Sequence, residues 1–360
     1  MVKIIFFIGR MAAGGGAEKV MAMLANHFVD KGWDVDIVLL LGNEVDKNHH
    51  QLDERINIID YSPSQNCSYL INLFRWVIHI RRLVKKQQPD LMVSFFGRIN
   101  ALVLTSTLGL NIPIIVSERN DPRHDNRGKV MLNYCNLIYR RARTIVYQTK
   151  YEQSCFSSVH LSKSHIIPNP IKIVDIYNAK IDKNLIINVG RLQKHKNQEM
   201  LINAVKLVKE RVPSVKCQIF GEGITHDYLQ GLIDDCKLQD TVTLEGKKGN
   251  ILDYVSSGYV FVTTSNYEGL SNALMEAMML GKICITTDYE GADDLIDNGI
   301  NGIIVPRNDV MRLSKVLIDI LSDTTGKYSV LGENARKTMM KYESSEIMSK
   351  WDKIINIVVQ

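Results

Sequence analysis

Short, nearly continuous apolar runs alternate along this chain with longer segments whose apolar residues recur at helical spacing. In the first half such runs predict strands at 3–8, 32–41, 91–96, 112–116 and 144–148. Apolar runs without polar alternation are typical of strands buried on both faces of a parallel sheet. Helical segments follow the strands, so the pattern predicts an open parallel sheet with helices on both faces.

The second half repeats this architecture after a break. Pro168 and Pro170 interrupt the pattern, and we expect a hinge at 166–184. Further strands are expected at 185–190, 215–220, 241–244, 259–264, 283–287 and 302–305, followed by three helical patterns after residue 309. At 360 residues, the chain is too long for one ordinary core. The α/β prediction is two Rossmann-like doubly wound domains facing across a cleft, 1–165 and 185–343, with the helix 344–360 packing back on the first.

The stretch 266–281 carries the strongest local signal. It follows an apolar strand as a short loop, and from Leu270 to Gly281 it predicts a helix that is apolar on nearly every face. Glu276 is the only charge in this helix, and a buried carboxylate needs compensating hydrogen bonds or a cation. Glu268 lies in the loop before it, where the free N–H groups of a helix N-terminus favour a carboxylate or a phosphate nearby.

A basic loop offers the matching cations. Gly190, Arg191 and Lys196 follow the first strand of the second domain. Ligands bind at the carboxyl ends of strands in open α/β sheets, so we expect Arg191 and Lys196 on the same rim as Glu268. A diphosphate there would be held by two cations and a helix N-terminus. Taken alone, a basic loop is more typical of a solvated surface.

Composition fits a protein that stays in the cytoplasm. The apolar fraction is 45% and the charged fraction 23%, as in soluble globular proteins. No apolar run reaches the roughly 20 residues that span a bilayer, and the apolar N-terminus is too short for a signal peptide. Six cysteines without a C-x-x-C pair indicate a reduced compartment and argue against zinc. No nucleic-acid partner is expected.

Charge is concentrated in the first half of the chain. Residues 1–165 hold 21 Lys and Arg against 14 Asp and Glu, a net charge of +7, whereas residues 166–360 carry −2. On a helix, the run from Arg75 to Lys86 places Trp76 and its apolar neighbours on one side and basic residues towards the other. This pattern suits an anionic membrane surface, and it is equally that of an ordinary α/β surface helix.

Glycines also lie where the first strand turns into a helix. Gly14, Gly15 and Gly16 would let a ligand approach the backbone closely. They do not form the G-x-G-x-x-G fingerprint, and the acidic positions that would hold a ribose, Asp34 and Asp36, fall inside a strand. A nicotinamide-binding site is therefore poorly supported.

At these positions the chain resembles retaining glycosyltransferases of the two-domain GT-B fold, in the large family called GT4. The resemblance runs from Lys3 to about Ile320. Its most specific parts are Gly14-Gly-Gly-Ala-Glu18, Val189-Gly-Arg-Leu-Gln-Lys-His-Lys-Asn-Gln198, Gly221-Glu-Gly223 and the E-x7-E stretch from Glu268 to Glu276. Among relatives, the length and Ser117-Glu-Arg-Asn-Asp-Pro122 are similar to bacterial enzymes that extend undecaprenyl-diphosphate-linked oligosaccharides for capsule, O-antigen or protein glycans.

The resemblance implies roles for the site residues. Arg191 and Lys196 would neutralise the diphosphate of a UDP-sugar, Glu268 would contact the donor sugar, and Glu276 would accept hydrogen bonds from the ribose. Without nucleotide, these groups would hold uncompensated charge. The remaining donor-binding positions are Gly15, Gly16, Gly190, Gly246, Asn250, Gly269, Leu270 and Ser271. The implied mechanism is front-face displacement, in which the leaving phosphate takes the acceptor proton and the protein stabilises charge.

The acceptor side departs from the family pattern. Many relatives carry a histidine where Arg119 stands here, and Arg119 cannot lose a proton to act as a base. Glu118 is the alternative base, and phosphate or carboxylate binding on a basic rim is the alternative role of Arg119. Asp34 and Asp36 match the D-x-D of metal-dependent glycosyltransferases but fall in a first-domain strand, so no metal or other cofactor is expected.

The predicted function is a peripheral enzyme on the inner face of the cell membrane, moving a hexose or N-acetylhexosamine from a UDP-sugar to a lipid-linked saccharide. A non-hydrolysing UDP-N-acetylglucosamine epimerase is an alternative with the same fold. A dinucleotide-dependent oxidoreductase and a nucleotide-binding partner subunit without catalysis also remain open. The full set of Arg191, Lys196, Glu268 and Glu276 argues against the last of these.

Overall fold

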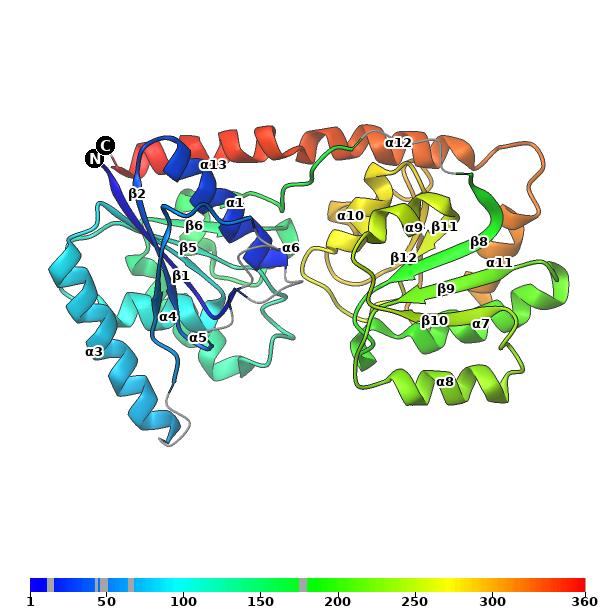
Figure 1. Cartoon of the computed structure of the whole chain (residues 1–360), viewed down its shortest axis with the longest axis horizontal. Helices are drawn as coiled ribbons and strands as arrows, with labels where there is room; N and C mark the ends of the chain where they lie inside the picture. The colour runs from blue at the N-terminus through cyan, green and yellow to red at the C-terminus, as the bar shows by residue number, and fades with distance from the viewer. Residues whose placement is uncertain (12–15, 43–44, 46–50, 64–67, 175–179, 360) are drawn as a thin grey trace. The chain divides into compact units, whose positions relative to one another are not determined.

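The computed structural model describes residues 1–11, 16–42, 45, 51–63, 68–174 and 180–359, drawn in Figure 1. It divides into two compact units. Unit 1 comprises Met1–Pro170 and Ser345–Gln360, and unit 2 comprises Ile171–Ser344. Each unit contains one parallel sheet between two layers of helices, which confirms the predicted fold class.

Unit 1 is built on a seven-stranded parallel sheet in the order β3-β2-β1-β4-β5-β6-β7. Its strands are β1 (Lys3–Ile8), β2 (Asp34–Leu39), β3 (Asn57–Asp60), β4 (Leu91–Phe95), β5 (Ile114–Ser117), β6 (Thr144–Tyr147) and β7 (Ser164–Ile166). The two outermost strands, β3 and β7, were not predicted. Both are short and have no fully buried residue, so neither carries the apolar run that marks the central strands.

Successive residues of the central strands of unit 1 face opposite cores. Ile4, Phe6 and Ile8 of β1 point into one core, and Ile5 and Phe7 into the other. The helices of unit 1 are α1 (Gly16–Asp30), α3 (Tyr69–Gln87), α4 (Gly97–Ser106), α5 (Gly128–Ile138), α6 (Lys150–Ser154) and α13 (Ser344–Val359), with short 3-10 turns at Tyr139–Arg141 and Ser158–Lys163. Helices α1 and α13 cover the first core, and α3, α4 and α5 cover the second.

The last helix of the chain is an integral part of unit 1. In Figure 1, α13 lies beside α1 at the opposite end of the colour scale. Trp351 of α13 is fully buried and packs near Phe95 of β4, with ring centroids 6.3 Å apart. Nε2 of His27 in α1 lies 3.0 Å from Oδ1 of Asp352 in α13, within hydrogen-bond distance. The final residues therefore close the core that the first residues begin.

Unit 2 is built on a six-stranded parallel sheet in the order β10-β9-β8-β11-β12-β13. Its strands are β8 (Asp182–Val189), β9 (Lys216–Phe220), β10 (Val242–Gly246), β11 (Gly258–Val262), β12 (Ile283–Thr287) and β13 (Ile303–Val305). Its helices are α7 (Gln198–Arg211), α8 (His226–Asp235), α9 (Ile251–Ser257), α10 (Asn272–Met279), α11 (Val310–Leu321) and α12 (Ser329–Met339), with 3-10 turns at Lys194–Lys196, Ala292–Asp294 and Met340–Tyr342. Helices α7, α8 and α11 cover one face, and α9, α10 and α12 the other.

The order of strands in unit 2 positions its ligand site. From β8 the sheet extends through β9 and β10 on one side and through β11, β12 and β13 on the other. The loops after β8 and β11 therefore leave two adjacent strands for helices on opposite faces. In open α/β sheets such a switch point forms a crevice at the carboxyl ends of the strands, and ligands bind there.

Candidate functional site

Lys196 and Glu268 meet at this switch point of unit 2. Lys196 belongs to the turn after β8 and Glu268 to the loop after β11. The Lys196 ammonium contacts Oε1 of Glu268, and the Ser265 hydroxyl donates to the same oxygen at 2.7 Å. Both charged side chains are mostly buried. The prediction that this site holds uncompensated charge without nucleotide is therefore wrong for this pair, because the two groups neutralise each other.

The two loops that carry this pair are hydrogen bonded to each other. The N–H of Asn266 donates to the carbonyl of His195 at 2.7 Å, and the Thr264 hydroxyl donates to the carbonyl of Lys196 at 3.0 Å. The Arg307 guanidinium, from the loop after β13, donates to the carbonyl of Asn266 at 3.0 Å. Three strand ends thus fix the backbone on which the ion pair is displayed.

An aromatic stack flanks the ion pair. The rings of His195 and Tyr267 lie nearly parallel with centroids 4.9 Å apart. Partial burial lowers the pKa of His195, and the charges of Lys196 and Arg191 lower it further while Glu268 opposes them. A neutral imidazole at neutral pH follows from this environment. His195, Tyr267 and Arg307 were missed from the sequence because each lies in a loop without periodicity.

Close backbone contact brings the loops after β8 and β9 together. Gly221 has a φ of +138°, and a Cβ atom there would lie 2.0 Å from the carbonyl oxygen of Gly190. Only glycine tolerates both the backbone angle and the contact. Gly190 itself lies beside the aliphatic stem of Lys196. Arg191 follows directly and is exposed. The loop that presents the two predicted diphosphate cations is thus held by glycine packing.

Helix α10 begins at Asn272 and not at Leu270 as predicted, and Glu276 is less buried than predicted. It starts at Asn272, so Gly269 and Leu270 belong to the half-buried loop before it, and Ser271 is buried at its N-cap. The prediction that Glu276 is a buried carboxylate is wrong, because its side chain is only partly buried. The helix packs into its core through Leu274, Met275, Ala277, Met278 and Met279, which leaves position 276 on the remaining side.

The other predicted donor positions are spread over two units. Gly246 ends β10, and its carbonyl accepts the N–H of Gly221 at 2.9 Å. Asn250 is exposed at the start of α9. Gly16 begins α1 in unit 1, and Gly15 lies outside the described residues. Within unit 2, therefore, the structure places Arg191, Lys196, Glu268 and the loop of Gly246 at one edge of the sheet.

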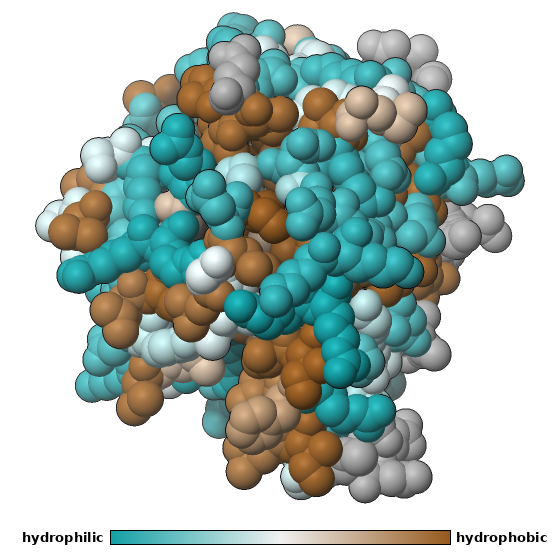
Figure 2. Space-filling view, turned by 90° about the vertical axis from the view of Figure 1, so that its left-hand side faces the viewer, coloured by the Kyte–Doolittle hydropathy of each residue, from teal (hydrophilic) through white to brown (hydrophobic). Residues whose placement is uncertain are grey.

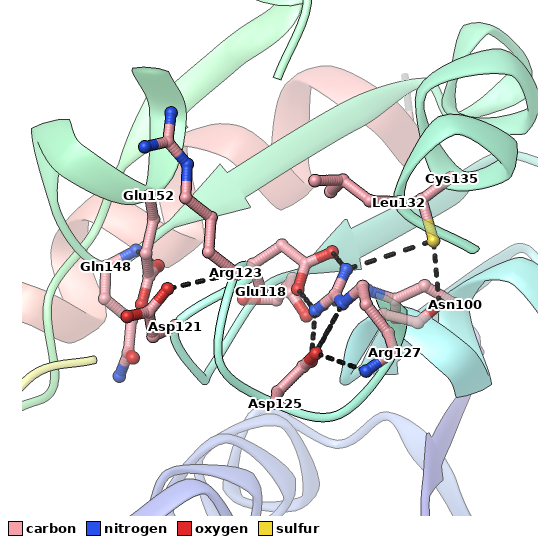
Figure 3. A network of polar contacts seen from close by, with 12 residues as sticks. Asn100, Glu118, Asp121, Arg123, Asp125, Arg127, Leu132, Cys135, Gln148 and Glu152 are labelled. Carbon is pink, nitrogen blue, oxygen red and sulfur yellow. Dashed lines mark hydrogen bonds and ion pairs between the residues drawn. The ribbon is translucent and has the colours of Figure 1, made fainter. Parts of the chain in front are cut away.

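The acceptor-side residue Glu118 is part of a buried network in unit 1 (Figure 3). Its carboxylate accepts two hydrogen bonds from the Arg127 guanidinium, at 2.9 and 2.6 Å, and one from the Tyr139 hydroxyl. Asp125 accepts further hydrogen bonds from Arg127. Glu118 is fully buried. These contacts give it a structural role, and its predicted role as an acceptor base receives no support from them.

Arg119 is also buried in unit 1. Its guanidinium lies over the rings of Phe95, at 4.7 Å, and Trp351, at 5.5 Å, and donates to Oδ1 of Asn169 at 3.1 Å. Burial lowers the pKa of Arg119, and the carboxylate of Glu152 opposes that shift. Cation–π contacts of this kind hold Arg119 against the last helix of the chain. The alternative role of Arg119, phosphate or carboxylate binding on a basic rim, receives no support from this buried position.

The metal-binding pattern does not assemble. Asp34 and Asp36 lie in β2, as predicted, and the Lys3 ammonium pairs with both, at 2.7 and 3.3 Å. Among the residues that the structure describes, no group of three His, Cys, Asp or Glu side chains is arranged to hold a metal ion. Independence from metals remains a prediction.

Two parallel-sheet α/β units of this kind are typical of the GT-B fold of glycosyltransferases, and comparison with known families identifies the family. Residues 171–338 match the family described as "Glycosyl transferases group 1", and residues 14–174 match "Glycosyltransferase Family 4". Together the two matches cover most of the chain. The chain belongs to the family 4 glycosyltransferases.

Named relatives act on lipid-linked saccharides. The chain is 25% identical, over 99% of its length and 98% of the relative's, to the alpha-1,4-N-acetyl-D-galactosaminyltransferase for GalNAc-alpha-(1->4)-GalNAc-alpha-(1->3)-diNAcBac-PP-undecaprenol of Campylobacter jejuni. It is 22% identical, over 81% of its length and 80% of the relative's, to the UDP-Gal:alpha-D-GlcNAc-diphosphoundecaprenol alpha-1,3-galactosyltransferase of Escherichia coli. The Anabaena protein HepE, solved in complex with UDP and glucose, shares the fold with a TM-score of 0.80 at 16% identity, over 99% of this chain and 100% of HepE.

Proposed function

We propose that this glycosyltransferase moves a hexose or N-acetylhexosamine from a UDP-sugar to an undecaprenyl-diphosphate-linked oligosaccharide, with retention of the anomeric configuration. The transfer would take place at the inner face of the cell membrane, in the assembly of capsule, O-antigen or another glycan. The lipid-linked acceptors of the Campylobacter and Escherichia relatives support this acceptor class, and the UDP-Gal donor of the latter supports the nucleotide.

The observation that carries the proposal is the position of Lys196, Glu268 and Arg191 at the switch point of unit 2. A diphosphate placed there meets the Lys196 ammonium and the exposed Arg191 guanidinium. The carboxylate of Glu268 would contact the sugar beyond it. In this proposal Lys196 exchanges its contact with Glu268 for one with the donor, and Glu268 becomes available to the sugar hydroxyls.

In the proposed sugar transfer, negative charge develops on the departing diphosphate. The acceptor hydroxyl oxygen forms a bond to the anomeric carbon on the face from which the diphosphate leaves. The bond between that carbon and the diphosphate oxygen breaks, and its electron pair departs with UDP. The acceptor proton passes to the departing phosphate oxygen. Lys196 and Arg191 stabilise the negative charge that grows on this oxygen, as electrostatic catalysis requires.

The remaining donor contacts are assigned by position in unit 2. Glu276, which is partly buried on α10, would accept hydrogen bonds from the ribose hydroxyls. The backbone of Gly269 and Leu270 would donate to phosphate and sugar next to Ser271. The loop between Gly246 and Asn250 would hold the nucleobase beside the end of β10.

Lys196→Ala tests the diphosphate site. Titration calorimetry should show UDP binding weakened at least about tenfold, since a charge-assisted hydrogen bond contributes roughly 1.5–3 kcal/mol. The matched control is Lys194→Ala, which removes an exposed lysine from the same turn and should leave the affinity unchanged. Equal UDP affinity in the parent and Lys196→Ala would contradict the assignment.

Glu268→Gln separates binding from turnover. Because the amide no longer pairs with Lys196 or repels the diphosphate, UDP should bind as tightly as in the parent or more tightly. Transfer should fall by at least about a hundredfold, the typical effect of removing one electrostatic contact to a transition state. UDP release in the presence of lipid-linked acceptors measures turnover. A panel of UDP-sugars and acceptors that yields no release above that of Glu268→Gln would overturn the proposed activity.

An NMR experiment without acceptor distinguishes the epimerase alternative. Incubation with UDP-N-acetylglucosamine alone, followed by NMR, would show a second UDP-sugar only if the enzyme inverts a sugar centre without an acceptor. The proposed transferase leaves the sugar unchanged until an acceptor is added.

A further inference from the structure

The solvent-facing side of α3 is composed entirely of apolar and cationic side chains. Every exposed residue of α3 from Leu70 to Lys86 belongs to one of these two types. The apolar ones occupy its first half and the cationic ones continue to its end: Leu70, Ile71, Phe74, Arg75, Ile78, Arg82, Lys85 and Lys86. Phe74 is 69% exposed and Leu70 65% exposed.

These side chains form one continuous stripe. Leu70, Phe74 and Ile78 are spaced four residues apart, so they lie one above another on the helix, and Arg82 continues the row. The opposite side of α3, with Trp76, Ile80 and Val84, packs into the core of unit 1. The exposed apolar residues are therefore not a frayed part of the core. They point away from it on a 19-residue helix about 28 Å long.

The neighbouring helices extend the same chemistry. Helices α3, α4 and α5 cover one face of the unit 1 sheet and contain seven Lys and Arg and no Asp or Glu. Helix α5 adds exposed Val130, Tyr134 and Leu137. Helices α1 and α13, on the other face, contain three Lys and Arg against four Asp and Glu. The cationic character thus belongs to one face of unit 1.

Figure 2 views the molecule from the side on which α3 lies. Hydrophobic surface gathers at the lower end of the view, where α3 begins in Figure 1, and hydrophilic side chains lie above it. The sequence pattern from Arg75 to Lys86 indicated the basic part of this helix. The structure adds the exposed apolar half, which begins before Arg75.

We propose that the outward side of α3 docks on an anionic phospholipid bilayer, with its apolar half in the headgroup boundary and its basic half against lipid phosphates. A helix with these two features lies in the membrane interface, and its affinity rises with buried apolar area and anionic lipid content. None of the helices that the structure describes has the length and apolar character needed to span a bilayer.

Charge decides between a bilayer and a second copy of the chain. Two copies packed through this face would bring seven cations against seven without one carboxylate from these helices. A phospholipid surface with anionic headgroups supplies the opposite charge. Membrane docking rests on the proposed function in one respect: an acceptor carried on a lipid lies at a membrane surface, so the enzyme has to reach that surface. The residues that support docking are nevertheless separate from the donor site.

Vesicle sedimentation with the full chain tests membrane docking. The probes are vesicles of phosphatidylcholine alone and vesicles in which phosphatidylglycerol replaces part of it, with no saccharide lipid in either. The parent should bind the anionic vesicles at least about tenfold more tightly, and added salt should weaken that binding. Equal binding to both vesicle types, or none to either, would overturn the proposal.

Three variants locate the surface. Phe74→Glu places a charge in the apolar half and should lower vesicle binding at least about tenfold. Arg82→Glu with Lys85→Glu should lower it at least about 25-fold, since each basic residue near an anionic surface contributes about fivefold and the new carboxylates are repelled in addition. Ile224→Glu alters a 91% exposed apolar residue of unit 2 and should change nothing. Unchanged binding in Phe74→Glu would contradict the docking surface.

Two further measurements distinguish membrane docking from a defect in the donor site and from self-association. UDP affinity should be the same in the parent and the α3 variants. A variant that loses vesicle binding but binds UDP normally would therefore show that the membrane surface is separate from the donor site. Sedimentation velocity measures self-association. A dimer that Phe74→Glu dissociates, together with no binding of the parent to vesicles, would assign the surface to a second copy and refute membrane docking.

Discussion

Arg127→Met removes the cation from the buried network around Glu118. In the parent, the Arg127 guanidinium is almost fully buried and holds both carboxylate oxygens of Glu118, which has no exposed surface. It also lies against Gly97, where a Cβ atom would come within 2.1 Å of Nη1. Methionine keeps an unbranched apolar stem, ends before the position of the guanidinium, and has neither charge nor donors. The variant therefore leaves the Glu118 carboxylate with the Tyr139 hydroxyl as its remaining donor among the contacts described above.

The cost follows from the missing charge. Breaking a buried ion pair by removing one partner costs about 3–5 kcal/mol. The variant can limit this cost by binding a proton on Glu118, and making a carboxyl of ordinary pKa 4.3 neutral at pH 7 costs about 3.7 kcal/mol. We therefore expect unit 1 to lose about 3–4 kcal/mol at pH 7. At pH 5 the same proton costs about 1 kcal/mol, so the loss should fall to about 1–2 kcal/mol.

The sign of this pH dependence is fixed by proton binding. Above pH 4.3 the folded variant holds a proton that the unfolded chain has released, so its stability falls as pH rises. The difference in unfolding free energy between parent and variant should therefore widen from pH 5 to pH 7.

Urea denaturation followed by tryptophan fluorescence measures the unfolding free energy of unit 1. The three tryptophans, Trp33, Trp76 and Trp351, all belong to unit 1. The control is the double variant Arg127→Met with Glu118→Gln, which buries an amide in place of a carboxylate and should lose the pH dependence. A loss under about 1 kcal/mol at pH 7, or an equal loss at both pH values, would refute the reasoning.

Two more predictions concern unit 2. Burial lowers the pKa of Lys282 to about 8, so the unfolded chain binds more protons between this value and the ordinary 10.5, and this lysine makes unit 2 more stable as pH rises through that range. Calorimetric unfolding of Lys282→Met should lack the rise, and a parallel rise in both proteins would contradict the assignment. Gly221→Ala should push the loops after β9 and β8 apart at Gly190 and weaken UDP binding at least about tenfold, an effect of misplacing a positioned group by about 1 Å. The control, Gly231→Ala on α8, is exposed, meets no atom within 4 Å and should bind UDP normally; similar affinities in the two variants would exclude the contact as a determinant of binding.

The central strands could be predicted because burial on both faces leaves a direct trace in the sequence. All five residues of β12, Ile283–Thr287, are buried, and the predicted range matches the observed one. The edge strands β3 and β7 lack that trace, since neither contains a buried residue. Their pairing depends on the strands beside them, which a local pattern does not contain.

The donor-site loops were predictable only in part. Strand polarity places the residues after β8 and β11 at one edge, so the proximity of Lys196 to Glu268 follows from the topology. Their mutual ion pair does not follow, because it depends on side-chain rotamers in two loops.

The acceptor-side residues show a different limit. Arg119 contacts Trp351, more than two hundred positions later in the sequence, and Glu118 is bound by Arg127 in an irregular loop. Neither contact has a repeating spacing. A charged pair in a loop after a strand is read as exposed, and here both members are buried by segments that approach from elsewhere in unit 1.

The role of α13 in unit 1 also sets the order in which the chain can fold during synthesis. Unit 2 is one uninterrupted stretch, Ile171–Ser344, whereas the core of unit 1 includes Trp351, Ile355 and Val358 from the end of the chain. Domains generally fold from the N-terminus as they leave the ribosome. Here the first unit to be translated is the last to be completed: until the final helix emerges, the core that α1 covers lacks the packing of Trp351 near Phe95, while unit 2 already has all of its residues.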